Sequence, residues 1–251
     1  MINRILLAFS IVFFLVSCEK KDCCTIIEPV SVTLQFNHHW DGVPLNASDF
    51  NAFQFTNLNG ELIQIEKLRY LVSNISIGSQ VKNYQLINIG ENSGFQIIFE
   101  DVPQGSTFIK FTFGFSDADN VDGIYQDLNS VSFSVPPMLG GGYHFMQFDG
   151  KFKNTNNQDA NFNYHVIRAV NNTNPNNLEF FDTSFEVALG TFNLENNTTI
   201  EVEVNLAEWF KNPYTWNLNQ LNTVLMPNFE AQKQMSANGK SVFSLGAITQ
   251  N

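Results

Sequence analysis

Short runs in which apolar and polar residues alternate are the feature that most constrains the fold. The first, VSVTLQFNH at residues 30–38, places Val30, Val32, Leu34, Phe36 and His38 on one face. Successive side chains of a β-strand point to opposite faces, so this pattern predicts a strand with one buried face. Similar runs occur at 64–77, 83–89, 95–99, 108–115, 131–135, 143–152, 162–170, 185–189 and 200–204.

Turn-forming residues separate these runs. Examples are Asn59-Gly60, Pro103-Gln104-Gly105, Asp122-Gly123 and the Asn-rich stretch 171–177. Many short strands joined by such turns predict an all-β fold, here a β-sandwich of two mainly antiparallel sheets. One or two short helices are expected near the C-terminus, at 205–210 and 228–238, before a final strand at 242–245.

The composition limits the classes of partner. The chain has 25 Phe, only 15% charged residues and a formal net charge of −11. An acidic surface with few basic residues argues against nucleic acid as a partner. It attracts cations weakly, which is compatible with metal handling.

The N-terminus carries an export signal. Arg4 precedes an apolar run at 5–16 that is short for a membrane span, and Leu15-Val16-Ser17-Cys18 matches a bacterial lipoprotein cleavage pattern. We expect a signal peptide at 1–17, lipidation of Cys18, a tether at 18–28 and one folded domain at 29–251. The lipid would anchor the protein to a membrane of the bacterial cell envelope, with the outer membrane as the expected location. The alternative is an ordinary secretory signal.

The four histidines are the most informative polar residues: His38, His39, His144 and His165. Each falls inside or at the end of a predicted strand, and His144 is expected to share a face with Met146 and Phe148. Neutral imidazole is a good ligand for copper, zinc and nickel, and strand pairing can bring distant residues together. The alternative is that each histidine is a hydrogen-bonded core residue.

Other constellations are less specific. The acidic loop 117–123 could hold calcium, but its third acidic residue is displaced from the usual calcium-loop position, which favours surface turns instead. Gly140-Gly141-Gly142 is not followed by the lysine and helix of a phosphate loop, and predicts a close backbone approach or a bulge. The tryptophans Trp40, Trp209 and Trp216 could stack on sugars but more often lie in the core. No acid–base or nucleophile set stands out, so we expect a protein that is not an enzyme.

Several segments together resemble the MbnP-like family of copper-binding envelope proteins. They are LQFNH at 34–38 followed by Gly42, Pro44 and Leu45; EKLRYLVSNI at 66–75; YQLI at 84–87; FGF at 113–115 with its Asp-Asn-Gly loop; Gly142-Tyr143 leading to Asp149-Gly150; FNYH at 162–165; and the tail from Met226 through Ala231 to Phe243-Ser244-Leu245. The resemblance covers nearly the whole chain after the tether.

The resemblance implies a β-sandwich with a copper site built from histidines and a tryptophan oxidised to kynurenine, in some members by a dihaem peroxidase-like partner. His38 and His165 fall on motif positions as candidate ligands. The tryptophan has no counterpart between residues 128 and 142, where Phe133 is the nearest aromatic residue. His144 is a candidate third ligand in its place, with Met146 as a soft thioether if it faces the same side.

Two functions remain open from the sequence. The leading one is a non-enzymatic lipoprotein that binds copper through His38, His144 and His165 for storage or delivery. The alternative is a metal-free β-sandwich lipoprotein that binds a protein or glycan at the envelope surface. The distances among the three imidazoles distinguish them.

Overall fold

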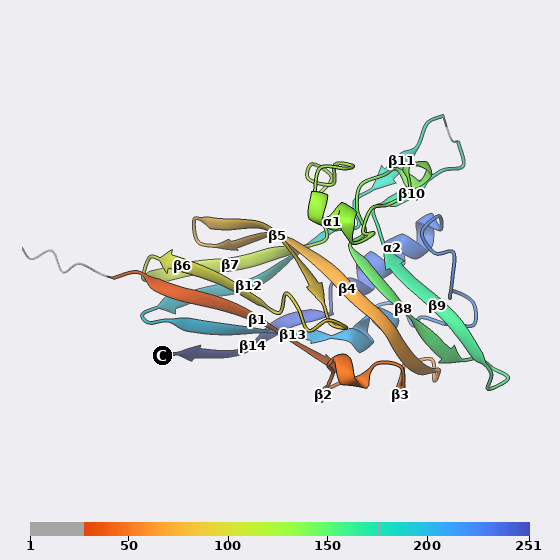
Figure 1. Cartoon of the computed structure of the whole chain (residues 1–251), viewed down its shortest axis with the longest axis horizontal. Coiled ribbons are helices and arrows are strands. Elements are labelled where there is room, and N and C mark those ends of the chain that lie inside the picture. The colour runs from red at the N-terminus through yellow and green to blue at the C-terminus, as the bar shows by residue number, and fades with distance from the viewer. Residues whose placement is uncertain (1–27, 175) are drawn as a thin grey trace, which may run out of the picture.

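The computed structural model describes residues 28–174 and 176–251. The predicted signal peptide, Cys18 and nearly all of the tether lie outside these residues. The described chain folds into two packed β-sheets with a small third sheet (Figure 1).

The first sheet is built around β1 (Val30–Trp40). Its order is β14 (Phe243–Gln250), β13 (Thr198–Asn205), β1 and β2 (Val43–Pro44), with β6 (Gln96–Val102) also pairing with β1. Among the described strands, β1 and β13 alone pair in parallel, from Val32 opposite Thr198 to His39 opposite Asn205. The other pairings of this sheet are antiparallel.

The second sheet is larger and is built around the long strand β4 (Leu62–Ile77). Its order is β12 (Phe185–Leu194), β7 (Gly105–Phe113), β4, β8 (Met146–Lys153) and β9 (Asp159–Val166), with β3 (Phe53–Thr56) and β5 (Gln80–Asn88) also pairing with β4. These pairings are antiparallel. The small sheet joins β10 (Ala169–Asn171) and β11 (Glu179–Phe181).

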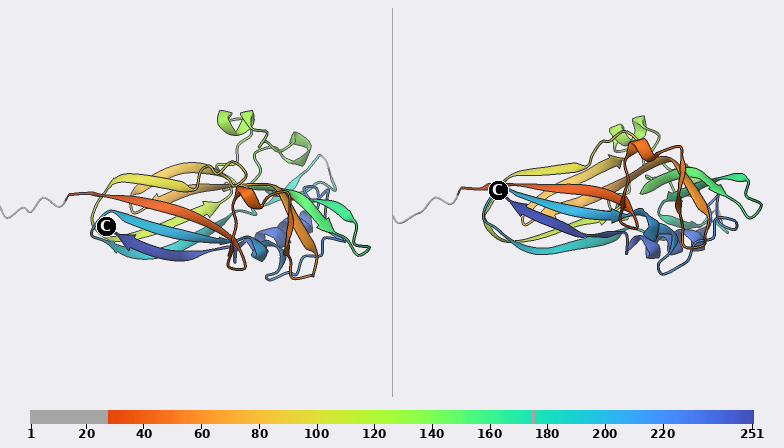
Figure 2. Two further views of the ribbon diagram at one scale, coloured as in Figure 1. Left: turned by 60° about the horizontal axis from the view of Figure 1, so that its bottom comes forward. Right: turned by 90° about the horizontal axis from the view of Figure 1, so that it is seen from below.

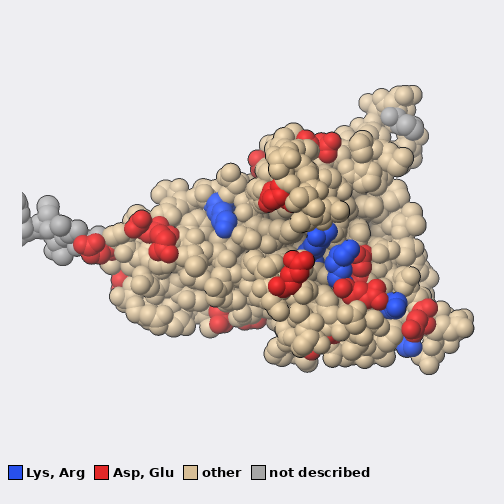
Figure 3. All heavy atoms as spheres, in the orientation of Figure 1, with Lys and Arg blue, Asp and Glu red and all other residues tan. Residues whose placement is uncertain are grey.

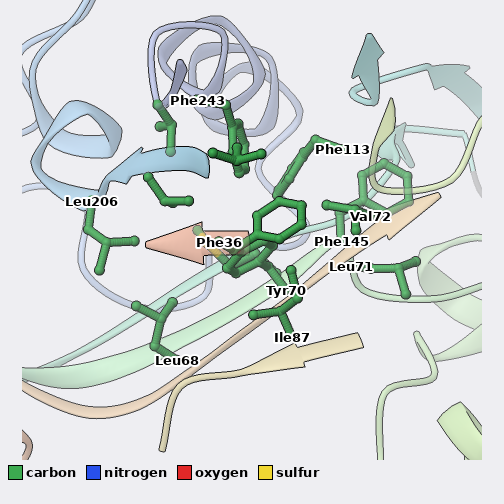
Figure 4. Packing of buried hydrophobic residues seen from close by; sticks show 14 of the residues in the cluster. Phe36, Leu68, Tyr70, Leu71, Val72, Ile87, Phe113, Phe145, Leu206 and Phe243 are labelled. Carbon is green, nitrogen blue, oxygen red and sulfur yellow. The ribbon is translucent and has the colours of Figure 1, made fainter. Parts of the chain in front are cut away.

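The core lies between the two large sheets and is aromatic. Phe36 of β1, Tyr70 of β4 and Phe113 of β7 converge there (Figure 4), and each is at most 1% exposed. The Phe36 and Phe111 rings pack edge to face at 5.5 Å between centroids. The many phenylalanines in the sequence are thus used to fill the space between the sheets, where each buried side chain contributes about 2 kcal/mol.

Short helices connect or cover the strands. They are η1 (Ala47–Asp49), α1 (Gln126–Ser130), η2 (Pro137–Leu139), η3 (Leu206–Phe210) and α2 (Phe229–Gly239). Figure 2 shows β1, β13 and β14 side by side along the narrow half of the molecule and the helices gathered in the wide half. None of the helices in the described part of the chain has the length and hydropathy needed to span a bilayer.

The predicted β-sandwich is confirmed, as are both predicted C-terminal helices. Asn205 caps η3 by accepting from the Ala207 N–H, and Asn228 caps α2 by accepting from the Ala231 N–H. The strand predicted at 131–135 is wrong: this segment follows α1 as a loop whose one strand-like pairing is a bridge from Ser134 to Tyr143.

Candidate functional site

Two of the predicted ligands, His144 and His165, lie together on the outer face of the second sheet. His165 of β9 is opposite Gln147 of β8, and Asn163 is opposite Asp149, so these side chains share one face. The rings of His144 and His165 meet edge to face, with centroids 5.2 Å apart and planes at 85°. We refer to these two residues as the histidine pair.

A carboxylate fixes the ring of His165. Its Nε2 lies 2.7 Å from Oδ1 of Asp149, which also accepts a hydrogen bond of 2.7 Å from Asn163. The Lys67 ammonium lies 3.2 Å from the other carboxylate oxygen. Burial alone would raise the pKa of Asp149, but the hydrogen bonds from His165 and Asn163 hold that pKa well below its usual range.

These contacts decide which nitrogen of His165 is free. Because Asp149 is an anion, it only accepts, so Nε2 of His165 carries the hydrogen. Nδ1 of a neutral ring then keeps its lone pair. A carboxylate that holds one ring nitrogen while the other binds a metal is the usual outer-shell arrangement of metal-binding histidines.

His144 presents the opposite nitrogen. Its Nδ1 lies 2.9 Å from the carbonyl oxygen of Phe133, so Nδ1 donates and Nε2 carries the lone pair. This Nε2 atom is buried and has no hydrogen-bond partner among the described residues. Burial lowers the pKa of His144 to about 4, against a smaller opposing effect of the Phe133 carbonyl, so the ring is neutral. An unpaired buried acceptor costs about 1–3 kcal/mol, which a ligand on Nε2 would recover.

Charged side chains of the neighbouring strand β4 lie on the same face of the sheet as the pair. Arg69 of β4 donates from Nε to the Gln147 side chain at 2.8 Å and places its guanidinium 5.3 Å from the centre of the Phe133 ring. Lys67 and Glu66 follow along the same strand, and Figure 3 shows charged side chains gathered over this part of the surface. Charged groups therefore surround a site in which the His144 ring is neutral.

The glycine run before His144 explains its position. Gly142 has φ +79°, and a Cβ there would meet the Asn120 side-chain oxygen at 2.5 Å. That oxygen accepts a hydrogen bond of 2.8 Å from the Tyr143 N–H, and Asp122 accepts one of 3.2 Å from the Gly142 N–H. The acidic loop thus binds the glycine run through hydrogen bonds from its side chains to distant backbone N–H groups, and the predicted close backbone approach is present.

His38 does not join the pair. It lies on the apolar face of β1, as predicted, and its Nε2 is 2.9 Å from the hydroxyl of Tyr70 in the core between the sheets. Tyr70 and Arg69 are consecutive residues of β4, so Tyr70 points into the core while Arg69 lies on the outer face with the pair. The described residues contain no group of three or more His, Cys, Asp or Glu able to hold a metal ion. The sheet therefore separates His38 from the other two predicted ligands, His144 and His165.

The remaining candidates have structural contacts. His39 lies on the outer face of the first sheet, where Nδ1 accepts from the Gly42 N–H at 2.9 Å. Met146 is fully buried in the core, on the face of β8 opposite to Gln147, so it does not reach the pair. Trp40, Trp209 and Trp216 are each at most 4% exposed and belong to the core.

Taken together, the fold and the site define an all-β sandwich protein with a pair of adjacent histidines, one buried and one partly buried, on the outer face of its larger sheet. The sequence profile of the MbnP family matches residues 29–227, and the chain belongs to this family. The fold is similar to the solved structure of MbnP from Methylosinus trichosporium, with a TM-score of 0.56 and 13% identity, covering 88% of this chain and 99% of that one. The search of curated proteins found no match.

Proposed function

We propose that this protein is a lipid-anchored protein of the bacterial cell envelope that binds copper through the histidine pair, for storage or delivery and without catalytic turnover. Membership of the MbnP family supports a role in copper binding, because the resemblance implies a copper site built from histidines. The observation that carries the proposal is the unpaired, buried Nε2 of His144 beside the ring of His165.

The ligand set favours copper over zinc. Zinc sites in proteins are nearly always four-coordinate, with three or four protein ligands. The described residues offer two free imidazole nitrogens and no third ligand of the usual kinds. Cu(I) accepts two nitrogen ligands, and imidazole suits copper well. Bound copper would supply a positive charge held between two neutral rings, with Asp149 nearby to compensate it.

The cellular location rests on the sequence. The segment ending at Cys18 has the lipoprotein pattern, and a diacylglycerol on that cysteine would hold the protein at a membrane. Figure 1 places β8 and β9 in the half of the molecule opposite the end where β1 begins. An anchor before β1 would therefore leave the histidine pair facing away from the membrane, within reach of a soluble redox partner such as a dihaem peroxidase-like protein.

Titration of the full-length chain with Cu(I) against a coloured competing chelator tests the proposal. We expect one Cu(I) per chain, and a loss of affinity of at least about 100-fold in His144→Gln and in His165→Asn, because each removes one of two ligands. The same titration with Zn(II) should show much weaker binding.

His39→Asn and His38→Gln are the matched controls, since both change a histidine that lies away from the pair. Both should bind copper as the unmodified chain does. Absence of copper binding, or unchanged affinity in the His144 and His165 variants, would refute the proposal. Loss of copper binding in His38→Gln alone would show that the copper site lies in the core, at His38, and not at the histidine pair.

A further inference from the structure

On one edge of β1, a gap separates the two strands that pair with it, β6 and β2. β6 accompanies β1 as far as the hydrogen bond of 2.8 Å from the Phe36 N–H to the Phe95 carbonyl. Beyond the gap, the segment that contains β2 pairs with β1, and there the Leu45 N–H donates to the His38 carbonyl at 2.9 Å. A cavity of about 650 Å³ lies in this break; we call it the β1 opening, and it is lined by Gln35, Phe36, Asn37, His38, His39, Gly42, Pro44, Leu45, Asn46, Phe95 and Glu203.

The imidazole of His38 provides a hydrogen-bond donor at the inner side of the β1 opening. The Tyr70 hydroxyl is buried, and its hydrogen bond is to Nε2 of His38 at 2.9 Å. Because a buried hydroxyl hydrogen needs an acceptor, Tyr70 donates and Nε2 accepts. Nδ1 of His38 then carries the hydrogen, and it makes no hydrogen bond to another described residue. The ring of Phe95 packs against this imidazole at 4.9 Å between centroids.

An acceptor lies at the outer side. Glu203 of β13 has a side chain that is 32% exposed, and its carboxylate is 3.7 Å from Nε2 of His39, too far for a strong hydrogen bond. The amides of Gln35, Asn37 and Asn46 add groups that both donate and accept. The lining of the opening thus includes a donor, a carboxylate acceptor and three amides.

The charges of the lining restrict the ligand. Among the residues that the structure describes, neither lysine nor arginine lines the β1 opening, whereas one carboxylate does. An anion would therefore meet repulsion without compensation. A compact cation would be attracted to Glu203 but would meet the N–H of His38 on the inner side. A ligand whose groups donate to the carboxylate and accept from the imidazole, and which carries no charge, satisfies both.

We propose that the β1 opening binds a neutral hydroxylated ligand of monosaccharide size. Hydroxyl groups donate to Glu203 and accept from His38, while the carbon–hydrogen face of a sugar ring packs against Phe95 and Leu45. The volume lies within the range of small-molecule sites. This site belongs to the first sheet, is separate from the histidine pair and does not depend on copper binding.

Nuclear magnetic resonance titration of the ¹⁵N-labelled full-length chain tests the proposal. The probes are methyl glucoside, methyl galactoside and methyl mannoside, with glucuronate as the anionic and glucosamine as the cationic counterpart. At least one neutral glycoside should shift the amide signals of His38, Phe95 and Glu203 with half-saturation at about 1 mM, as expected for a ligand of this size. Glucuronate should bind at least about tenfold more weakly.

Glu203→Gln and Glu201→Gln form a matched pair of variants. Glu201 lies two residues away on the same face of β13 but does not line the opening. Glu203→Gln should weaken binding of the neutral glycoside about tenfold, since a hydrogen bond to a charged acceptor is lost. Glu201→Gln should leave it unchanged. No saturable shift with any neutral glycoside, equal binding of either charged probe, or equal effects of the two variants would overturn the proposal.

Discussion

At the scale of single residues, two buried histidines use their ring nitrogens differently. His38 accepts from a tyrosine hydroxyl in the core, whereas His144 donates to the Phe133 carbonyl and leaves Nε2 unpaired. The hydrogen bond to Tyr70 ties His38 to the core, and its other ring nitrogen is not among the fully buried polar atoms that lack a partner. An unpaired buried nitrogen next to a second imidazole needs a ligand, which is why the proposal rests on His144.

Asp149 offers a test at this scale that rests on the proposed copper site. Asp149→Asn keeps the size of the side chain but removes the anion that holds Nε2–H of His165. We expect Cu(I) affinity to fall about 10–100-fold, as is usual when an outer-shell partner of a metal-binding histidine is lost. The affinity would be measured by chelator competition.

Nitrogen chemical shifts of the imidazole rings give a second measurement that is independent of copper. In the unmodified chain without copper, His165 should be the Nε2–H tautomer, and Asp149→Asn should shift it toward a mixture of tautomers. Asp159→Asn is the control, because Asp159 pairs with Lys153 at the exposed end of β9. Unchanged tautomer and affinity in Asp149→Asn would show that the carboxylate does not position His165.

At the scale of elements, α2 is joined to β9 by one buried side chain. Gln232 is fully buried; its oxygen accepts from the Ile167 N–H at 2.9 Å and its nitrogen donates to the His165 carbonyl at 2.8 Å. The helix therefore supplies hydrogen bonds to the strand at the residue that carries the ligand. This contact connects helix packing to the geometry of the histidine pair.

We expect Gln232→Met to destabilise the protein by about 2–3 kcal/mol, because the Ile167 N–H and the His165 carbonyl lose their partners while the volume is nearly conserved. Urea unfolding measures the loss. Gln234→Met on the same helix is the control, since Gln234 is only half-buried and has no comparable hydrogen bonds. A loss below about 1 kcal/mol would show that α2 is held by its apolar contacts alone.

Strands and helices with clear local patterns could be predicted from the sequence, and elements defined by distant contacts could not. The alternation at 30–38 fixes β1 and the inward direction of His38. The pattern fails around β8, where every residue from Tyr143 to Phe148 is buried because the 131–135 loop covers the outer face. The alternation therefore predicts His144 on the same face as Met146 and Phe148, whereas His144 lies with His165 on the outer face. The strand-like run 131–135 is apolar for the same reason: it packs over the sheet as a cover.

At the scale of the whole molecule, the two large sheets and the segment 131–135, which packs over the second sheet, place the histidines in separate environments. The sequence resemblance placed His38 and His165 on motif positions but carried no information on which side of a sheet each would face. Strand pairing brought His144 and His165 together, and the core separated His38 from them. Each large sheet therefore carries one of the two proposed binding sites, the copper site and the site for a neutral ligand.

Both buried imidazoles make the stability of the fold depend on pH. Burial lowers the pKa of His38 to about 3 and that of His144 to about 4, whereas the unfolded chain titrates near the ordinary histidine value of 6.5. Between these values the unfolded state binds protons that the folded state does not. The two neutral histidines therefore make their full contribution to the free energy of unfolding above about pH 6.5, and this contribution is lost as the pH decreases toward 4.

We expect the free energy of unfolding to fall by about 2 kcal/mol for each histidine between pH 7.5 and pH 5, measured by urea unfolding without copper. The result at pH 5 depends little on the folded-state values as long as both stay below 5. Most carboxyl groups remain ionised in this range, so their contribution is small. His38→Gln should remove about half of the pH dependence. A free energy of unfolding that stays constant between pH 7.5 and 5 would mean that both rings accept protons in the folded state, and that neither is held neutral by its surroundings.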